Sequence, residues 1–105
     1  MTTAMRIEVQ GGDPISAQAR TYAEYRLLAA LTQSRAERVR LARLVLRQTE
    51  RTSCASVVCS VTVAFIGSRT LRIRTTGGHA YAAVNRAIER LRVVAATGAM
   101  EVRLS

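Results

Sequence analysis

The chain has 105 residues, a length that typically forms one domain, and 49% of its residues are hydrophobic, which excludes a disordered chain. No stretch approaches the roughly 20 consecutive apolar residues of a membrane-spanning helix, and residues 1–7 lack the basic-then-apolar order of a secretory signal. We therefore expect one cytoplasmic domain spanning residues 1–105 with no membrane partner.

The charge balance is the most informative feature of the composition. Sixteen basic residues face seven acidic ones, which gives a formal net charge of +9, and every basic residue is an arginine. A GC-rich genome would explain the choice of arginine over lysine, but it would not explain the shortage of acidic residues. The guanidinium group binds phosphate through two hydrogen bonds at once. The sequence therefore indicates an anionic partner, with nucleic acid favoured over an acidic membrane surface.

The chemistry-bearing residues do not form a catalytic or metal-binding pattern. Cys54 and Cys59 are five positions apart, an odd spacing, so on a strand they would point to opposite faces and could not form a disulfide. A metal site would need a closer cysteine pair and more ligands, and the chain has a single histidine, His79. We expect a reducing compartment, no cofactor, no metal ion, no small-molecule substrate and no enzyme activity.

The N-terminal third predicts a strand followed by a helix. Residues Met5–Val9 alternate apolar and charged side chains, as a half-buried strand does, and Gly11–Pro14 then interrupts the pattern. Ser16 is a candidate N-cap for a helix over Ser16–Gln33. The apolar stripe of this helix is formed by Ile15, Ala19, Tyr22, Ala23, Leu27, Ala30 and Leu31.

The middle of the chain predicts strands. Arg38–Thr49 taken alone fits a strand or a helix, but Val57–Ile66 is rich in β-branched residues and Thr70–Thr75 alternates again. The turn at Ile66–Arg69 makes these two a hairpin, and Arg38–Thr49 is then best interpreted as a third antiparallel strand. The residues expected to share a face are Arg40, Ala42, Leu44 and Leu46, then Val57, Cys59, Val61, Val63 and Phe65, then Leu71 and Ile73.

The C-terminal third predicts a second helix. Gly77 and Gly78 end the sheet, and a helical stripe follows over Ala80–Thr97, with Gly98 as its stop. That stripe is formed by Tyr81, Val84, Ile88, Leu91 and Ala95. The order β-α-β-β-β-α with two amphipathic helices predicts an α+β fold, a four-stranded sheet with both helices packed on one face.

The segment before the second helix allows two interpretations. Gly77-Gly78-His79 could form a phosphate cradle at a helix N-terminus, but it lacks the Walker spacing and lysine, so a turn is favoured. His79 has no metal-ligand or catalytic partner near it in the sequence. Tyr81 falls at helical spacing with Val84 and Ile88, which favours a core residue over a base-stacking platform.

These elements carry residues that resemble the ribosome hibernation-promoting factor family. Met5–Gly11 is similar to the family's opening strand and glycine, and Arg20–Leu27 is similar to its first helix. The most specific match is Thr75–Leu91, which follows the family's pattern of a glycine, a capping residue, a Tyr-Ala-Ala motif and a later Asp-Lys-Leu. The resemblance runs from Met5 to about Val94.

The resemblance implies both a fold and a function. The family fold is similar to double-stranded RNA-binding domains, and its members are not enzymes. They bind the small ribosomal subunit in the channel used by messenger and transfer RNA, and keep ribosomes idle in stress or stationary phase. Basic residues on the two helices contact ribosomal RNA. The chain resembles the family's short form, without the C-terminal dimerisation domain that pairs ribosomes.

The resemblance also implies where RNA would be contacted. Arg26 stands where the family has a basic residue on its first helix, and Arg90 stands where it has the lysine of Asp-Lys-Leu. Ala29 and Val93 replace two further basic positions, and His79 replaces an acidic cap. We expect the guanidinium groups of both helices to converge on one cationic groove. The candidate RNA-binding residues are Arg20, Arg26, Arg35, Arg38, Arg86, Arg90 and Arg92.

Each of these candidates has a structural alternative. Arg86 and Arg90 could belong to an ordinary solvated helix face, and Arg26 could serve packing, with its stem along the apolar stripe and its head directed to water. Arg72 and Arg74, on the outer face of the sheet, could simply prevent aggregation. The loss of basic residues at Ala29 and Val93 also keeps open a diverged paralogue, a protein-interaction or self-associating module. We expect a monomer or a weak dimer.

Overall fold

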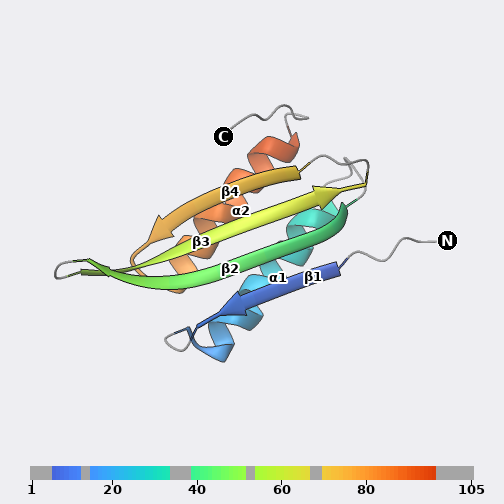
Figure 1. Ribbon diagram of the computed structural model, residues 1–105. Coiled ribbons are helices and arrows are strands. Elements are labelled where there is room, and N and C mark those ends of the chain that lie inside the picture. Colours follow the sequence, from blue (N-terminus) through green and yellow to red (C-terminus); the bar gives the residue numbers. More distant parts are fainter. Residues whose placement is uncertain (1–5, 13–14, 34–38, 52–53, 67–69, 97–105) are drawn as a thin grey trace.

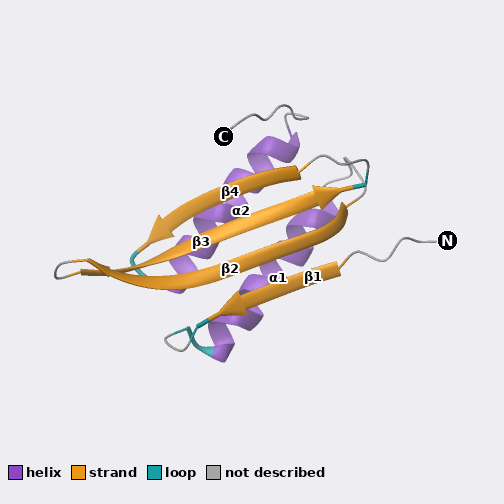
Figure 2. Cartoon of the chain, in the orientation of Figure 1, coloured by secondary structure: helices purple, strands orange, loops and turns teal. Residues whose placement is uncertain are grey.

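The structure, a computed structural model, describes residues 6–12, 15–33, 39–51, 54–66 and 70–96. Its elements are β1 (Arg6–Gly11), α1 (Ala17–Gln33), β2 (Val39–Arg51), β3 (Cys54–Phe65), β4 (Thr70–Gly77) and α2 (Ala80–Ala96). The four strands form one sheet, and both helices lie against the same face of it (Figure 1). Figure 2 shows the two layers, with the other face of the sheet uncovered by any helix. The predicted α+β fold and element order are confirmed.

The strands lie in the sheet in the order β1-β2-β3-β4, so β1 and β4 are its edges. β1 pairs with β2 in parallel, from Arg6 opposite Leu41 to Gly11 opposite Leu46. Such a pair needs a crossover connection, which α1 provides. β2 pairs with β3 and β3 with β4 in antiparallel fashion, which confirms the antiparallel strand predicted over Arg38–Thr49.

The core lies between the inner face of the sheet and the two helical stripes. The buried strand residues are Ala42, Leu44 and Leu46 of β2, Val57, Cys59, Val61 and Val63 of β3, and Leu71 and Ile73 of β4. The alternation therefore predicted most of the inner face correctly. Arg40 is exposed, because the register of β2 shifts between Val39 and Leu41, and Phe65 is half-buried. The α1 stripe is also buried, apart from a half-buried Tyr22, and α2 adds two small core residues, Ala83 and Ala87, that the stripe had not included.

Tyr81 is the exception among the predicted core residues. Its side chain is 39% exposed, so the prediction that it belongs to the core is wrong. Tyr81 lies in the first turn of α2, where its ring meets the ring of Tyr22 edge-on at a centroid distance of 5.0 Å. This contact places Tyr81 between the two helices and not between α2 and the sheet.

Both helices begin at a side chain that caps them. The Ser16 hydroxyl accepts a hydrogen bond from the Ala19 amide at 3.1 Å, which confirms the predicted N-cap. His79 Nδ1 accepts one from the Ala82 amide at 3.2 Å, so it caps α2 when that nitrogen carries no proton. The predicted stop at Gly98 lies outside the described residues, as do Arg35 and Arg38.

The described helices also bear on membrane association. Neither α1 nor α2 is long and apolar enough to cross a membrane.

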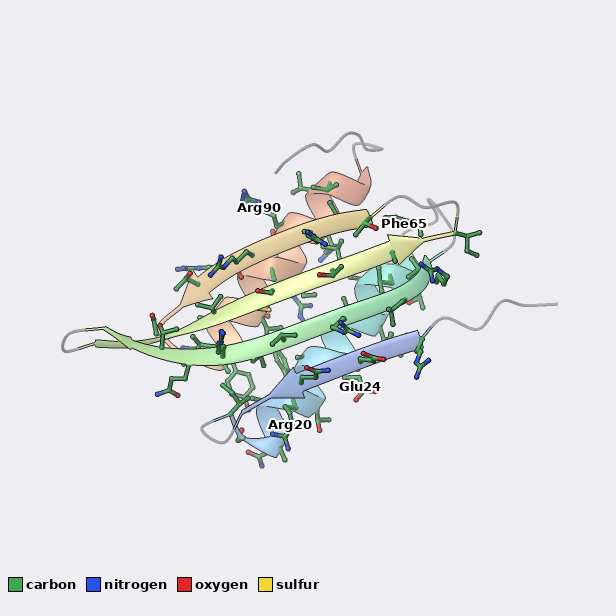
Figure 3. The ribbon with its side chains drawn as sticks, in the orientation of Figure 1. Arg20, Glu24, Phe65 and Arg90 are labelled. Atoms are coloured by element: carbon green, nitrogen blue, oxygen red, sulfur yellow. The ribbon has the colours of Figure 1, made fainter. Side chains whose placement is uncertain are left out.

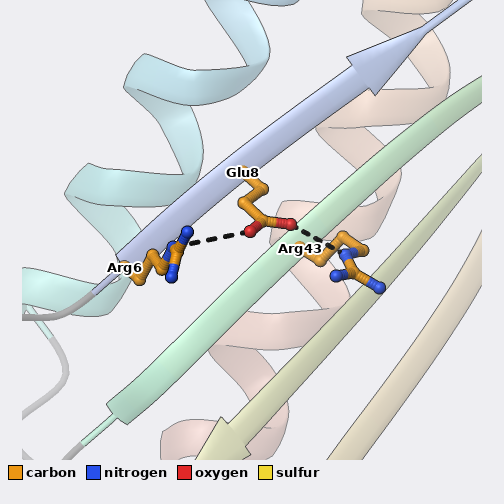
Figure 4. A network of polar contacts seen from close by, with 3 residues as sticks. All are labelled: Arg6, Glu8 and Arg43. Carbon is orange, nitrogen blue, oxygen red and sulfur yellow. Dashed lines mark hydrogen bonds and ion pairs between the residues drawn. The ribbon is translucent and has the colours of Figure 1, made fainter.

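The outer face of the sheet carries charge, as Figure 4 shows for β1 and β2. There the Glu8 carboxylate lies 3.5 Å from Arg6 Nε and 3.0 Å from Arg43 Nε. These ion pairs are largely exposed and each adds no more than about 1 kcal/mol to stability.

Candidate nucleic-acid interface

The two helices are held together by a polar contact and an aromatic one. The Tyr22 hydroxyl of α1 donates a hydrogen bond to Asn85 Oδ1 of α2 at 2.7 Å, and the Tyr22 ring meets the Tyr81 ring. A buried or half-buried tyrosine hydroxyl needs such a partner. These contacts fix which flank of each helix faces the other, and hence where the arginines on both helices point.

Arg26 lies on the flank of α1 that faces α2. It follows Tyr22 by one helical turn, so both residues lie on the same side of the helix. Its side chain is half-buried, and its Nε is buried with no hydrogen-bond partner among the described residues. This agrees with the predicted position of Arg26 along the groove between the helices, and it leaves one guanidinium donor unused.

Arg92 lies on the flank of α2 that faces α1. It follows Asn85 by two turns of α2, so it shares the flank of the helix that faces α1. Its side chain is exposed. Arg26 and Arg92 thus lie on the facing flanks of the two helices, and a cationic groove formed by them stays a prediction.

Arg86 and Arg90 lie on the opposite flank of α2, beside the edge strand β4. Arg86 Nη1 donates a hydrogen bond to the carbonyl of Thr76, in β4, at 2.7 Å. Arg90 lines a cleft of about 470 Å³ that also includes Arg72 and Arg74 of β4. Both side chains project into solvent, as expected, but away from the groove between the helices.

The structure therefore does not bring the predicted arginines into one groove. Arg20 lies at the start of α1, where its Nη1 donates to the Ile15 carbonyl at 3.0 Å. Figure 3 shows Arg20 and Glu24 on the β1 side of the molecule and Arg90 on the β4 side. Four of the seven candidates lie on α2 or on the flank of α1 that faces it. We call them the helix-side surface: Arg26, Arg86, Arg90 and Arg92.

Acidic residues interrupt this surface at one position. Glu89 is the single carboxylate in the sequence of α2, and it borders a hollow of about 450 Å³ together with Arg86 and Arg90. Among the described residues, Glu8 is the one carboxylate that forms ion pairs within 4.0 Å, and its partners are Arg6 and Arg43. The arginines of the helix-side surface are therefore not neutralised by a described carboxylate. The surface remains able to bind an anion.

Two arginines near this surface, for which the sequence favoured prevention of aggregation at least as much as binding, were not among the predicted RNA-binding residues. Arg72 and Arg74 share the cleft with Arg90, although the alternation in β4 indicated only that they face outward. The missing information was that β4 is an edge strand and that α2 runs beside it. The outward alternation of two arginines on one short strand was the signal that could have marked them.

The described residues offer no group of three or more His, Cys, Asp or Glu side chains that could hold a metal ion. Cys59 is a free, buried thiol, and the side chain of Cys54 lies outside the described residues. The site consists of guanidinium groups, which can bind phosphate through charge and hydrogen bonds.

Cys59 provides a test of the core. Burial raises the pKa of its thiol from 9.0 to about 12, because an apolar environment disfavours the thiolate. Below pH 9 the thiol is neutral in the folded and the unfolded chain, and its burial contributes fully to the free energy of unfolding. As the pH rises from 9 toward 12, the unfolded chain loses the proton first, so this contribution is lost. In the variant Cys54→Ser, we expect Cys59 to stay unreactive to a disulfide reagent at pH 8 and to react at once in urea. Fast reaction of the native protein would contradict its burial.

Comparison with known proteins supports the fold. No protein-family model and no curated protein sequence matches the chain. Among solved structures, the chain is similar to the N-terminal domain of Protein Y from Thermus thermophilus, with a TM-score of 0.66 and 21% identity over 84% of this chain and 91% of that one. It is similar to a ribosomal subunit interface protein from Coxiella burnetii, with a TM-score of 0.66 and 15% identity over 88% and 94%. These likenesses confirm the fold that the sequence resemblance implies.

Proposed function

We propose that the protein is a ribosome-associated, RNA-binding factor that docks its helix-side surface on ribosomal RNA of the small subunit. The observation that carries this proposal is the set of four arginines around α2, with one interrupting carboxylate, on a fold shared with a ribosomal subunit interface protein. The family resemblance extends the proposal to its consequence. The bound protein would occupy the channel of messenger and transfer RNA and keep ribosomes idle in stress or stationary phase.

The proposed mechanism is occupancy of a site, without chemical change. Each guanidinium that meets a phosphate releases condensed counterions, so the logarithm of the affinity falls by about 0.7 to 0.9 per phosphate for each unit of log salt. Specificity would come from the shape of folded RNA, because double-stranded RNA is recognised mostly through its backbone and shape. The protein is a binding factor and not an enzyme in this proposal.

The test is co-sedimentation of the purified protein with small ribosomal subunits at low and moderate salt. The variant R86Q/R92Q removes one arginine from each flank of α2, and we expect its affinity to fall about tenfold. The control R6Q/R20Q removes the same charge from the β1 side, and we expect it to bind like the wild type. Equal co-sedimentation of R86Q/R92Q and wild type would show that the helix side is not the docking face.

Exposed apolar residues on the helices support a second candidate, a protein-interaction or self-associating module. Tyr25 and Leu28 of α1 are 67% and 43% exposed, and Val93 of α2 is 59% exposed. Size-exclusion chromatography with light scattering separates the two candidates. A salt-insensitive dimer that retains no RNA would favour the module over the ribosome-binding factor.

A further inference from the structure

The outer face of the sheet, which the helices leave uncovered, has its own pattern of side chains. Since alternate residues of a strand point to opposite faces, the neighbours of the buried strand residues point outward. Figure 3 views the molecule from this side, with both helices behind the sheet. The outward residues that matter here are Arg43 and Arg47 on β2, Ser60 and Thr62 on β3, and Arg72 and Arg74 on β4.

The strand register arranges these residues as a shallow trough that follows β3. Thr62 lies opposite Arg43 on one side and opposite Arg72 on the other. Ser60 lies opposite Arg74 in the next outward row. Neighbouring strands are about 4.8 Å apart, so β2 and β4 stand about 10 Å apart. Arginines of β2 and β4 therefore stand on both sides of Thr62, while the β2 residue opposite Ser60 is Val45 and the β3 residue opposite Arg47 is Val58.

The charge of the trough is largely free to meet a ligand. Arg43 is engaged by Glu8, but Arg47, Arg72 and Arg74 are exposed and have no described carboxylate within ion-pair distance. Arginine forks bind phosphate oxygens in pairs, and hydroxyl groups can bind phosphate or sugar oxygens. This combination suits a polyanion whose charges repeat along a line.

The apolar content of the trough argues against a membrane as its ligand. Surface binding to lipid needs apolar side chains that enter the acyl boundary. None of the exposed large apolar side chains among the described residues belongs to the four strands, and the outward Val45 and Val58 are half-buried. The outward residues of the trough are also not aromatic, so bases would have no ring to stack on. A nucleic-acid backbone is the ligand that fits.

The trough is continuous with the helix-side surface around the edge of the sheet. The cleft of about 470 Å³ is lined by Ser60, Thr62, Arg72 and Arg74 from the outer face and by Arg90 from α2. Its apolar lining is formed by Val61, Leu71, Ile73 and Val94. A strand that lies in the trough and crosses β4 would therefore meet Arg90 next. We infer that the outer face of the sheet is a second RNA-binding surface, which takes the sugar-phosphate backbone of one RNA strand without regard to base sequence.

The experiment measures binding of fluorescein-labelled oligouridine and oligoadenosine by fluorescence anisotropy over a range of salt. For R72Q/R74Q we expect about tenfold weaker binding of both probes and a salt slope smaller by about 1.4, since two phosphate contacts are lost at about 0.7 each. The control R20Q, at the start of α1 and away from the outer face, should keep the wild-type slope. R72K/R74K keeps the charge and loses the forked guanidinium group. Its affinity should lie between the affinities of R72Q/R74Q and the control.

Several outcomes would overturn the inference. Unchanged affinity of R72Q/R74Q would do so, as would a strong preference for one base, or vesicles of phosphatidylglycerol that compete with the probe at equal affinity. Urea unfolding of R72Q/R74Q serves as the folding check, since exposed substitutions of this kind usually change stability by less than about 0.5 kcal/mol.

The inference and the proposed function can fail separately. If R86Q/R92Q loses small subunits while R72Q/R74Q binds oligonucleotides like the wild type, the helix side is the docking face and the trough is not an RNA site. If R72Q/R74Q loses the probes while R86Q/R92Q keeps its subunits, the trough binds RNA and the helix-side proposal is wrong.

Discussion

Replacing Leu27 with alanine should lower the free energy of unfolding by about 3 kcal/mol, because it removes a fully buried side chain and leaves a cavity. Leu27 lies in the middle of α1 with no exposed surface, on the stripe that faces the sheet. Alanine is a better helix former than leucine, so the loss would come from packing alone. The measurement is the midpoint of urea unfolding followed by circular dichroism.

The adjacent Leu28 provides the matched control. Leu28 is 43% exposed, so Leu28→Ala removes the same atoms from a position that contributes little to packing. We expect the free energy of unfolding to change by less than about 0.5 kcal/mol. If both variants unfolded at the same urea concentration, the orientation of α1 on the sheet would be wrong.

Replacing Gly77 with alanine should cost about 2 to 3 kcal/mol, because the new methyl group has no room. A Cβ at Gly77 would lie 2.6 Å from the backbone nitrogen of Ala83 and 2.9 Å from the Cβ of Ala82. These atoms belong to the first turns of α2 and cannot move without shifting the helix against β4. The same variant should bind small subunits more weakly, since α2 carries Arg86 and Arg92.

Gly78 is the control that distinguishes this packing effect from a general loss of stability when any glycine of the turn is replaced. A Cβ at Gly78 would meet nothing within 4 Å. We expect Gly78→Ala to be neutral or to stabilise by a few tenths of a kcal/mol, through a less flexible unfolded chain. Thermal unfolding of the two variants is the comparison, and equal losses would contradict close packing of α2 on Gly77.

Much of the fold could be predicted because alternation and helical spacing are local signals. The strand over Arg38–Thr49 was ambiguous alone, and its neighbours in the chain resolved it. The parallel pairing of β1 with β2 was not predicted, because alternation tells which face of a strand is buried and says nothing about which strand lies beside it. The edge position of β4 was missed for the same reason.

The arrangement of the candidate site was harder to predict than its residues. Helical spacing fixes the angle between Arg86 and Arg92 on α2, but it does not say which flank meets α1 and which meets β4. That depends on the contact of Tyr22 with Asn85, which joins residues far apart in the sequence. Tyr81 was misplaced in the same way, since its spacing fits the stripe while its position favours the gap between the helices.

The parallel pair of β1 and β2 sets a requirement on the nascent chain. Synthesis delivers β1 first, and its partner residues, from Leu41 to Leu46, emerge only after the whole of α1. During that interval Ile7 and Val9 lack the sheet that partly covers them. Arg6 and Glu8 alternate with these apolar residues, and such charges discourage a waiting strand from pairing with other chains.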